Sequence, residues 1–97
     1  MRRDEAVRLL SEHRAELEAM GVTSLALFGS VARDEAGPDS DVDVIIDVRR
    51  PFSLFDLARV HLRLEEIMGC KVDVATEGGM HQRYRQRIEP DLVYVSP

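Results

Sequence analysis

Two aspartates, Asp41 and Asp43, stand two residues apart in a segment that alternates polar and apolar residues. On a strand, such a pair points to the same side, with about 6–7 Å between the two backbone positions. Carboxylates so placed repel each other unless a cation lies between them. Mg²⁺ suits this place where phosphates are bound, because it takes one or two carboxylates and completes its shell with phosphate oxygens and water. A solvated strand face is the alternative interpretation, and the pair alone favours that simpler one.

The dipeptide Gly29-Ser30 lies where a short apolar segment, residues 24–28, turns into a predicted helical stretch, residues 31–33. Glycine lets a phosphate approach the backbone, and the start of a helix offers free N–H groups. A simple turn with a capping serine would also explain the dipeptide. Ten residues separate it from Asp41, and a chance match to the whole pattern is on the order of one in a thousand for a chain of this length. Together the two motifs predict a phosphate and Mg²⁺ site.

A third acid, Asp73, stands between Val72 and Val74 in another strand-like segment. If that strand neighbours the strand of Asp41 and Asp43, all three carboxylates converge. Asp73 would then act as the general base on an attacking hydroxyl, or complete the metal site. An outward-facing strand residue is the alternative.

The elements that position these residues follow from periodicity, caps and breakers. We expect helices at 4–20, 31–33, 53–68 and 80–89, and strands at 24–28, 41–48, 71–75 and 92–95. Ser53 and Asp56 form a predicted capping box, and Gly69 ends that helix. The alternating order of helices and strands predicts an α/β (α+β) fold, with a small mixed sheet and helices packed on one face. Residues 1–97 are expected to form a single domain.

Composition narrows the class of protein. The 97 residues carry a net charge of −5, with 44% hydrophobic and 32% charged residues, which excludes a disordered chain and argues against direct, non-specific nucleic-acid binding. The single cysteine, Cys70, allows no internal disulfide, and the cysteine and three histidines lack zinc-site spacing. The sequence shows no apolar signal core and no membrane span, so we expect a cytoplasmic protein.

Several segments resemble one known family, the minimal nucleotidyltransferase (MNT) branch of the DNA polymerase beta superfamily. They are residues 27–33 (Leu-Phe-Gly-Ser-Val-Ala-Arg), 40–44 (Ser-Asp-Val-Asp-Val), 53–68, 69–76 and 93–95. The resemblance covers nearly the whole chain and is greatest to the antitoxin partners of HEPN-domain toxins. It implies the nucleotidyltransferase fold, transfer of AMP from ATP onto a hydroxyl with release of pyrophosphate, and a HEPN ribonuclease, modified on a tyrosine, as the partner.

The resemblance also implies roles for individual residues. Gly29, Ser30 and Arg33 would bind the triphosphate of ATP, while three carboxylates, Asp41, Asp43 and Asp73, would be catalytic and hold Mg²⁺. Arg33 contacts phosphate, or it pairs with a nearby acid and braces the loop. The family usually has glycine after that arginine, and this chain has Asp34. Aspartate tolerates left-handed backbone geometry, but it adds a negative charge near a triphosphate site.

Two further surfaces bear on possible partners. One is a basic cluster near the C-terminus, which is either a solvated helix face or a contact for an acidic partner or for RNA held by the partner. It consists of Arg83, Arg85 and Arg87 with His81 and Tyr84.

The helix at 53–68 carries two apolar sets, one with Leu54, Leu57, Leu64 and Met68 and the other with Phe55, Ala58 and Leu62. One set faces the sheet, and the other faces a partner or a second copy in a hetero- or homo-oligomer.

Protein adenylylation has two alternatives as the function. One is a contact-only antitoxin that has lost turnover, and the other is a free-standing transferase for a small molecule or RNA end.

Overall fold

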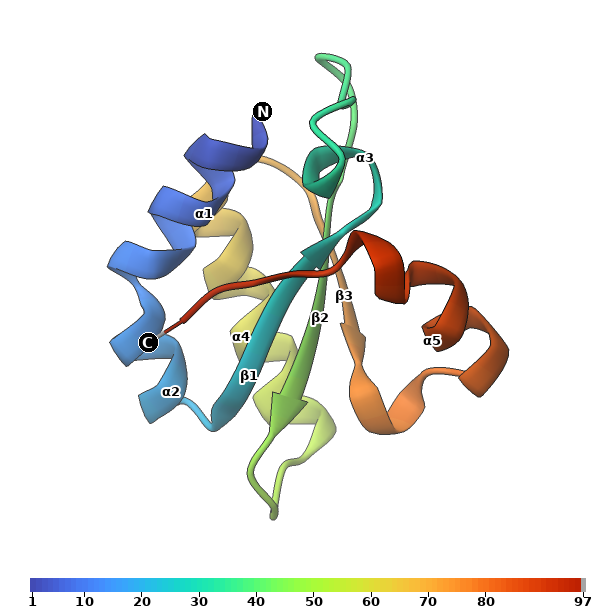
Figure 1. The fold of residues 1–97 in the computed structure, drawn as a ribbon. Helices are drawn as coiled ribbons and strands as arrows, with labels where there is room; N and C mark the ends of the chain where they lie inside the picture. Colours follow the sequence, from blue (N-terminus) through green and yellow to red (C-terminus); the bar gives the residue numbers. More distant parts are fainter. Residues whose placement is uncertain (97) are drawn as a thin grey trace.

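A computed structural model describes residues 1–96. The elements in chain order are α1 (Arg3–Glu12), α2 (Arg14–Ala19), β1 (Val22–Phe28), α3 (Gly29–Ala32), β2 (Val42–Val48), α4 (Leu54–Met68), β3 (Val72–Thr76), η1 (Glu77–Gly79), α5 (Gln82–Ile88), η2 (Glu89–Asp91) and β4 (Val93–Tyr94). The strands form one sheet in the order β3-β2-β1-β4, in which β2 and β3 are parallel and the other pairs are antiparallel (Figure 1). The predicted mixed sheet is therefore confirmed.

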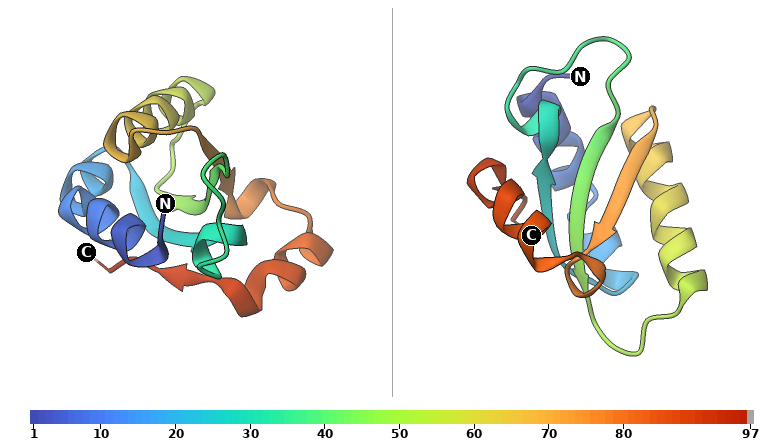
Figure 2. Two further views of the ribbon diagram at one scale, coloured as in Figure 1. Left: turned by 90° about the horizontal axis from the view of Figure 1, so that it is seen from above. Right: turned by 90° about the vertical axis from the view of Figure 1, so that its right-hand side faces the viewer.

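The main core lies between the sheet and the helices α1, α2 and α4, which cover one face (Figure 2). Val42, Val44 and Ile46 of β2 point into it and are fully buried, as the alternation of this strand predicted. Ile45 points to the opposite face, where it packs with Ala26 and Phe28 of β1 and with Ile88 of α5. The helix layer on one face is confirmed, and the short α5 covers part of the other face.

The predicted capping signals of α4 are present. The Ser53 hydroxyl accepts the Asp56 N–H, the Asp56 carboxylate accepts the Ser53 N–H at 2.8 Å, and Gly69 ends the helix in the left-handed region at φ 69°. The predicted apolar sets of α4 agree less well with the structure. Leu54, which was assigned to one set with Leu64 and Met68, is 83% exposed, whereas those two residues are buried. The buried line of α4 runs from Val60 to Met68, where the helix packs against α1 and β3, and its first turn lies uncovered.

The predicted continuous helix at 4–20 was wrong, because the chain breaks at His13, which has φ −109° and ψ 10°. α2 starts at Arg14, whose side chain is 2% exposed. Its guanidinium donates to the carbonyl oxygens of Val95, at 3.3 Å, and Val22, at 3.2 Å. The break therefore accompanies a buried arginine that ties α2 to β1 and to the end of the chain. Of the helices described, none is both long and apolar enough to cross a membrane.

Candidate active site

The parallel pairing of β2 and β3 places Asp43 directly beside Asp73. Paired residues of neighbouring strands point to the same face, about 4.8 Å apart in the hydrogen-bonding direction. The condition for convergence is thus met for these two carboxylates. Asp41 lies two residues before Asp43, at the entry to β2, and its charge also acts on Asp43.

The pKa of Asp43 is raised from 3.8 to about 6, first by burial, then by the charge and contact of Asp73, and then by the charge of Asp41. Arg33 lowers this pKa, but as the smallest of the causes. Among residues 1–96, no lysine, arginine or histidine forms a salt bridge with Asp41, Asp43 or Asp73. The site therefore concentrates negative charge without a protein cation to balance it.

Gly29 closes one side of this acidic site. It follows β1 and begins α3 with φ 74°, a backbone conformation in which residues other than glycine are strained. A Cβ atom at this position would lie 2.2 Å from the Asp43 Oδ2 atom. The predicted turn and the predicted acidic strand are thus in contact, and glycine is needed both for the backbone and for the approach of Asp43.

Ser30 follows in the first turn of α3, with its carbonyl oxygen accepting the Glu35 N–H at 2.8 Å. Its hydroxyl makes no hydrogen bond to another of residues 1–96. The hydroxyl is therefore available to a ligand at the start of α3.

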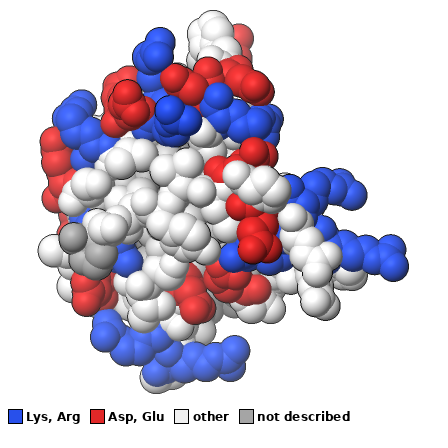
Figure 3. All heavy atoms as spheres, viewed as in Figure 1, with Lys and Arg blue, Asp and Glu red and all other residues white. Residues whose placement is uncertain are grey.

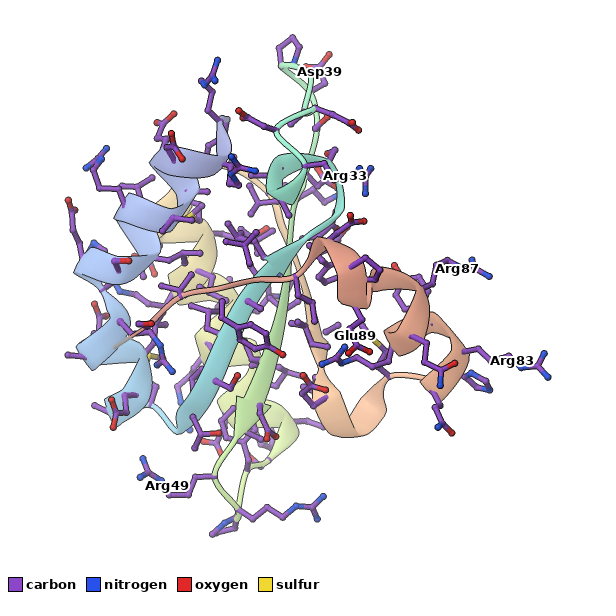
Figure 4. All side chains as sticks on the ribbon, in the orientation of Figure 1. Arg33, Asp39, Arg49, Arg83, Arg87 and Glu89 are labelled. Atoms are coloured by element: carbon purple, nitrogen blue, oxygen red, sulfur yellow. The ribbon has the colours of Figure 1, made fainter. Side chains whose placement is uncertain are left out.

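Of the two kinds of contact predicted for Arg33, the structure contains the pairing with nearby acids. Its guanidinium pairs with Glu35 and with Asp91 of η2, each at 3.1 Å, from the end of α3 (Figure 4). Hydrogen bonds to Glu35, then to Asp91, raise the pKa of Arg33. The arginine therefore braces the loop after α3 against the C-terminal part of the chain.

Asp34 adopts the left-handed conformation predicted for it, at φ 59°. Its carboxylate accepts the backbone N–H of Arg3 at 3.1 Å and the Arg2 guanidinium at 3.0 Å. The bond from the Arg3 N–H, ahead of the arginine charges, lowers the pKa of Asp34. This carboxylate therefore caps α1 from outside the helix, a role that no local pattern predicted.

A metal that binds here would use carboxylate oxygens. Within residues 1–96, no group of three His, Cys, Asp or Glu side chains is placed so that it could hold a metal ion. Mg²⁺ needs fewer protein ligands than that, because one or two carboxylates suffice when substrate phosphates complete the shell. The unbalanced carboxylate of Asp43, with that of Asp41 near enough for its charge to act on Asp43, fits this smaller donor set.

The basic cluster near the C-terminus is divided by the fold. Arg85 pairs with Glu77 at 3.0 Å and contacts the Tyr94 hydroxyl, whereas Arg83 and Arg87 project from α5 (Figure 4). The basic atoms at the right of the space-filling view lie over this helix (Figure 3). Tyr84 packs edge to face on Phe28, with ring centroids 6.4 Å apart.

The described surface also has two hollows outside the acidic site. One, of about 740 Å³, lies around Phe52 and Leu54 at the start of α4, and none of the three carboxylates lines it. The other, of about 460 Å³, follows β3 from Val74 to Thr76 and reaches Tyr84. The second hollow therefore begins one residue after Asp73.

The sequence matches the family described as Nucleotidyltransferase domain over residues 10–95. A Methanocaldococcus jannaschii relative, named as a putative protein adenylyltransferase, is 39% identical over 93 residues, which are 94% of this chain and 95% of the relative. The protein adenylyltransferase MntA of Thermococcus cleftensis is 32% identical over 93 residues, covering 95% of this chain and 94% of that protein. This chain belongs to the nucleotidyltransferase family, as the motifs predicted.

Solved structures of nucleotidyltransferases have the same fold as this chain. A structure described as a putative minimal nucleotidyltransferase has a TM-score of 0.82 at 34% identity and covers 96% of this chain and 95% of its own. An antitoxin from Shewanella oneidensis, solved as an MNT protein in complex with a tri-AMPylated HEPN toxin, has a TM-score of 0.67 at 13% identity, covering 93% of this chain and 71% of its own. The fold is therefore the predicted nucleotidyltransferase fold.

Proposed function

We propose that this protein transfers AMP from ATP to a hydroxyl of another protein, in a Mg²⁺-dependent reaction, and thereby acts as an antitoxin. The acceptor in this proposal is a tyrosine of a cognate HEPN ribonuclease toxin. Relatives that match nearly the whole chain carry the name protein adenylyltransferase, and a structural neighbour is the MNT partner of an AMPylated HEPN toxin. The observation that carries the proposal is the close approach of Gly29 to Asp43, which the sheet pairs with Asp73.

In this proposal Asp41 and Asp43 hold Mg²⁺, Asp73 stays free of the metal, and the start of α3 at Gly29 and Ser30 binds the triphosphate. Mg²⁺, when bound, neutralises the charge that develops on the phosphates. The absence of a Cβ at Gly29 lets the Asp43 carboxylate lie against the backbone at the start of α3, next to the proposed phosphate site. Arg33 acts indirectly, since its pairs with Glu35 and Asp91 hold the loop.

Asp73 is the base in this scheme, because it is exposed at the edge of the sheet while Asp43 is half-buried. The acceptor hydroxyl oxygen attacks the α-phosphorus, and its proton passes to the Asp73 carboxylate. The bond between the α-phosphorus and its bridging oxygen to the β-phosphate breaks, so that pyrophosphate leaves and AMP is joined to the acceptor oxygen. Positioning and charge neutralisation supply most of the rate in such transfers.

The test is the intact mass of the HEPN partner after incubation with this protein, Mg²⁺ and ATP. Asp43→Asn should abolish the gain of AMP. Asp47→Asn is the matched control, because Asp47 is exposed on the same strand but lies outside the acidic site. A gain that survives Asp43→Asn would contradict the assigned site. No gain by the wild-type protein, with a stable complex, would instead indicate an antitoxin that acts by contact alone.

A further inference from the structure

β3 is an edge strand of the sheet. Of its backbone N–H and C=O groups that point away from β2, only those of Val72, at the start of the strand, have side-chain hydrogen-bond partners. The Val72 N–H donates to the Glu65 carboxylate at 3.0 Å, and the Val72 carbonyl oxygen lies 2.7 Å from the His61 ring nitrogen Nε2. Both partners are side chains of α4. Because backbone groups alternate in direction along a strand, those of Val74 and the N–H of Thr76 face the same outer side.

Among residues 1–96, no side chain forms a hydrogen bond with these outward groups of Val74 and Thr76, as His61 and Glu65 do with those of Val72. Proteins generally cover or charge exposed edges, since an open edge attracts another strand. Here α4 supplies such cover for Val72 alone, which leaves a short open stretch at Val74 and Thr76.

A hollow of about 460 Å³ runs along this open stretch. Its walls are mostly apolar, with Leu57 of α4 and Met80 and Tyr84 from the α5 side. In both views of Figure 2, β3 lies between α4 and α5, so the hollow separates these two helices at the edge of the sheet. An extended peptide that adds to a sheet edge uses both features, backbone hydrogen bonds and side pockets for alternate side chains.

We propose that β3 receives an extended segment of the acceptor protein as an added strand, which brings the acceptor hydroxyl to Asp73. This inference rests on the proposed function, and it identifies how the substrate is held. A residue of the added strand opposite Asp73 points to the same face as Asp73, about 5 Å away between Cβ atoms. The ligand is therefore an extended, hydroxyl-bearing segment with apolar neighbours, recognised mainly through its backbone.

A second copy of this chain suits the edge less well. Two β3 strands paired across a two-fold axis at Val74 would bring both Asp73 carboxylates to diagonal positions, where like charges repel.

The test compares Val74→Pro with Val74→Ala. Proline removes the outward N–H of Val74, and edge strands tolerate it where that N–H does not serve the ladder; the ladder bonds to β2 come from the residues on either side. Alanine keeps the N–H and controls for the lost side chain. Loss of one backbone hydrogen bond and a clash of the ring with the incoming strand should lower kcat/KM for AMP transfer to the HEPN partner by about tenfold or more.

Binding of Mg²⁺ and the ATP analogue AMP-PNP should be equal in the two variants. Equal transfer by Val74→Pro and Val74→Ala would overturn the inference while leaving the proposed function intact. No transfer by the wild-type protein would mean that the proposed function fails, and this inference with it. A dimer of the protein alone that dissociates in Val74→Pro would assign the edge to a second copy and also overturn the inference.

A second measurement does not depend on the folding of a variant. Peptides that span the modified residue of the acceptor are N-methylated at one backbone position at a time and tested as substrates of the wild-type protein. Alternate positions should lose transfer, because only every second N–H of an added strand faces β3. Losses without this period of two would overturn the inference.

Discussion

Replacing Asp43 by asparagine should stabilise the metal-free protein at neutral pH while abolishing its activity. Asp43 is half-buried, and its pKa rises to about 6 through burial first and then through Asp73. At pH 7 to 8 the folded protein must therefore keep a carboxylate charged in an unfavourable place. Asparagine keeps the shape of the side chain and removes the charge.

The pKa sets the size and the sign of this effect. A rise from 3.8 to about 6 corresponds to about 3 kcal/mol between the two protonation states. Since solvent screens a half-buried group, we expect about 1–2 kcal/mol in practice. Folded wild-type protein holds the Asp43 proton more tightly than the unfolded chain does. The stability that this proton contributes to the wild type is fully present below pH 3.8 and is lost as the pH rises through about 6.

Urea unfolding in the presence of EDTA, at about pH 5 and about pH 8, measures the difference between the two proteins. Asp43→Asn should exceed the wild type at the higher pH, and its advantage should shrink at the lower one. Mg²⁺ should then stabilise the wild type more than the variant, because binding to the folded state adds to its stability. A variant that is no more stable than the wild type at the higher pH in EDTA would refute the argument that burial and Asp73 make the charge of Asp43 unfavourable.

Three further outcomes follow from particular contacts. Gly29→Ala should lower the free energy of unfolding by about 1–2 kcal/mol for the left-handed backbone alone, and should also weaken AMP-PNP binding by displacing Asp43; unchanged binding by calorimetry would contradict the contact. Arg14→Met should cost about 2–4 kcal/mol in urea unfolding, because it leaves two carbonyl oxygens without their buried donor; a cost near zero would show that water replaces the guanidinium. The bond to Arg63, then that to His13, lowers the pKa of Glu16 to about 2, so the stability advantage of the wild type over Glu16→Gln should be present above pH 4.5 and disappear as the pH falls toward 2; an advantage that persists in acid would exclude this ion pair as its source.

Local signals in the sequence predicted the parts of the fold that depend on neighbours along the chain. The capping box at Ser53 and Asp56 needs only four residues, and the alternation of β2 needs only its own side chains. The break at His13 gave no such signal, because residues 4–20 contain neither glycine nor proline. Its counterpart, the burial of Arg14, depends on the carbonyl oxygens of Val22 and Val95, one of them 81 residues away.

For the candidate site, the sequence predicted the residues, whereas their contacts depend on strand pairing. The sequence predicted that Asp43 and Asp73 would meet only if their strands were neighbours, and the parallel register of β2 and β3 supplies that condition. The contact between Gly29 and Asp43 required the pairing of β1 with β2 as well. Asp34 could be predicted to accept a left-handed backbone, but not to cap α1, because the capped Arg3 N–H lies 31 residues earlier in the chain.

The distribution of charge around the site connects these findings. Arg33 pairs with Glu35 and Asp91, and Asp34 is held by the start of α1, so the three charged residues that directly follow α3 already have partners outside the acidic site. These pairs hold the segment that follows α3 without neutralising Asp43, whose pKa stays high although Arg33 acts on it. If Arg33 were turned toward Asp43, the carboxylate would be balanced and its affinity for a cation reduced. The fold thus keeps the loop rigid and the carboxylates unbalanced at the same time, which is the arrangement that a site for Mg²⁺ and a triphosphate requires.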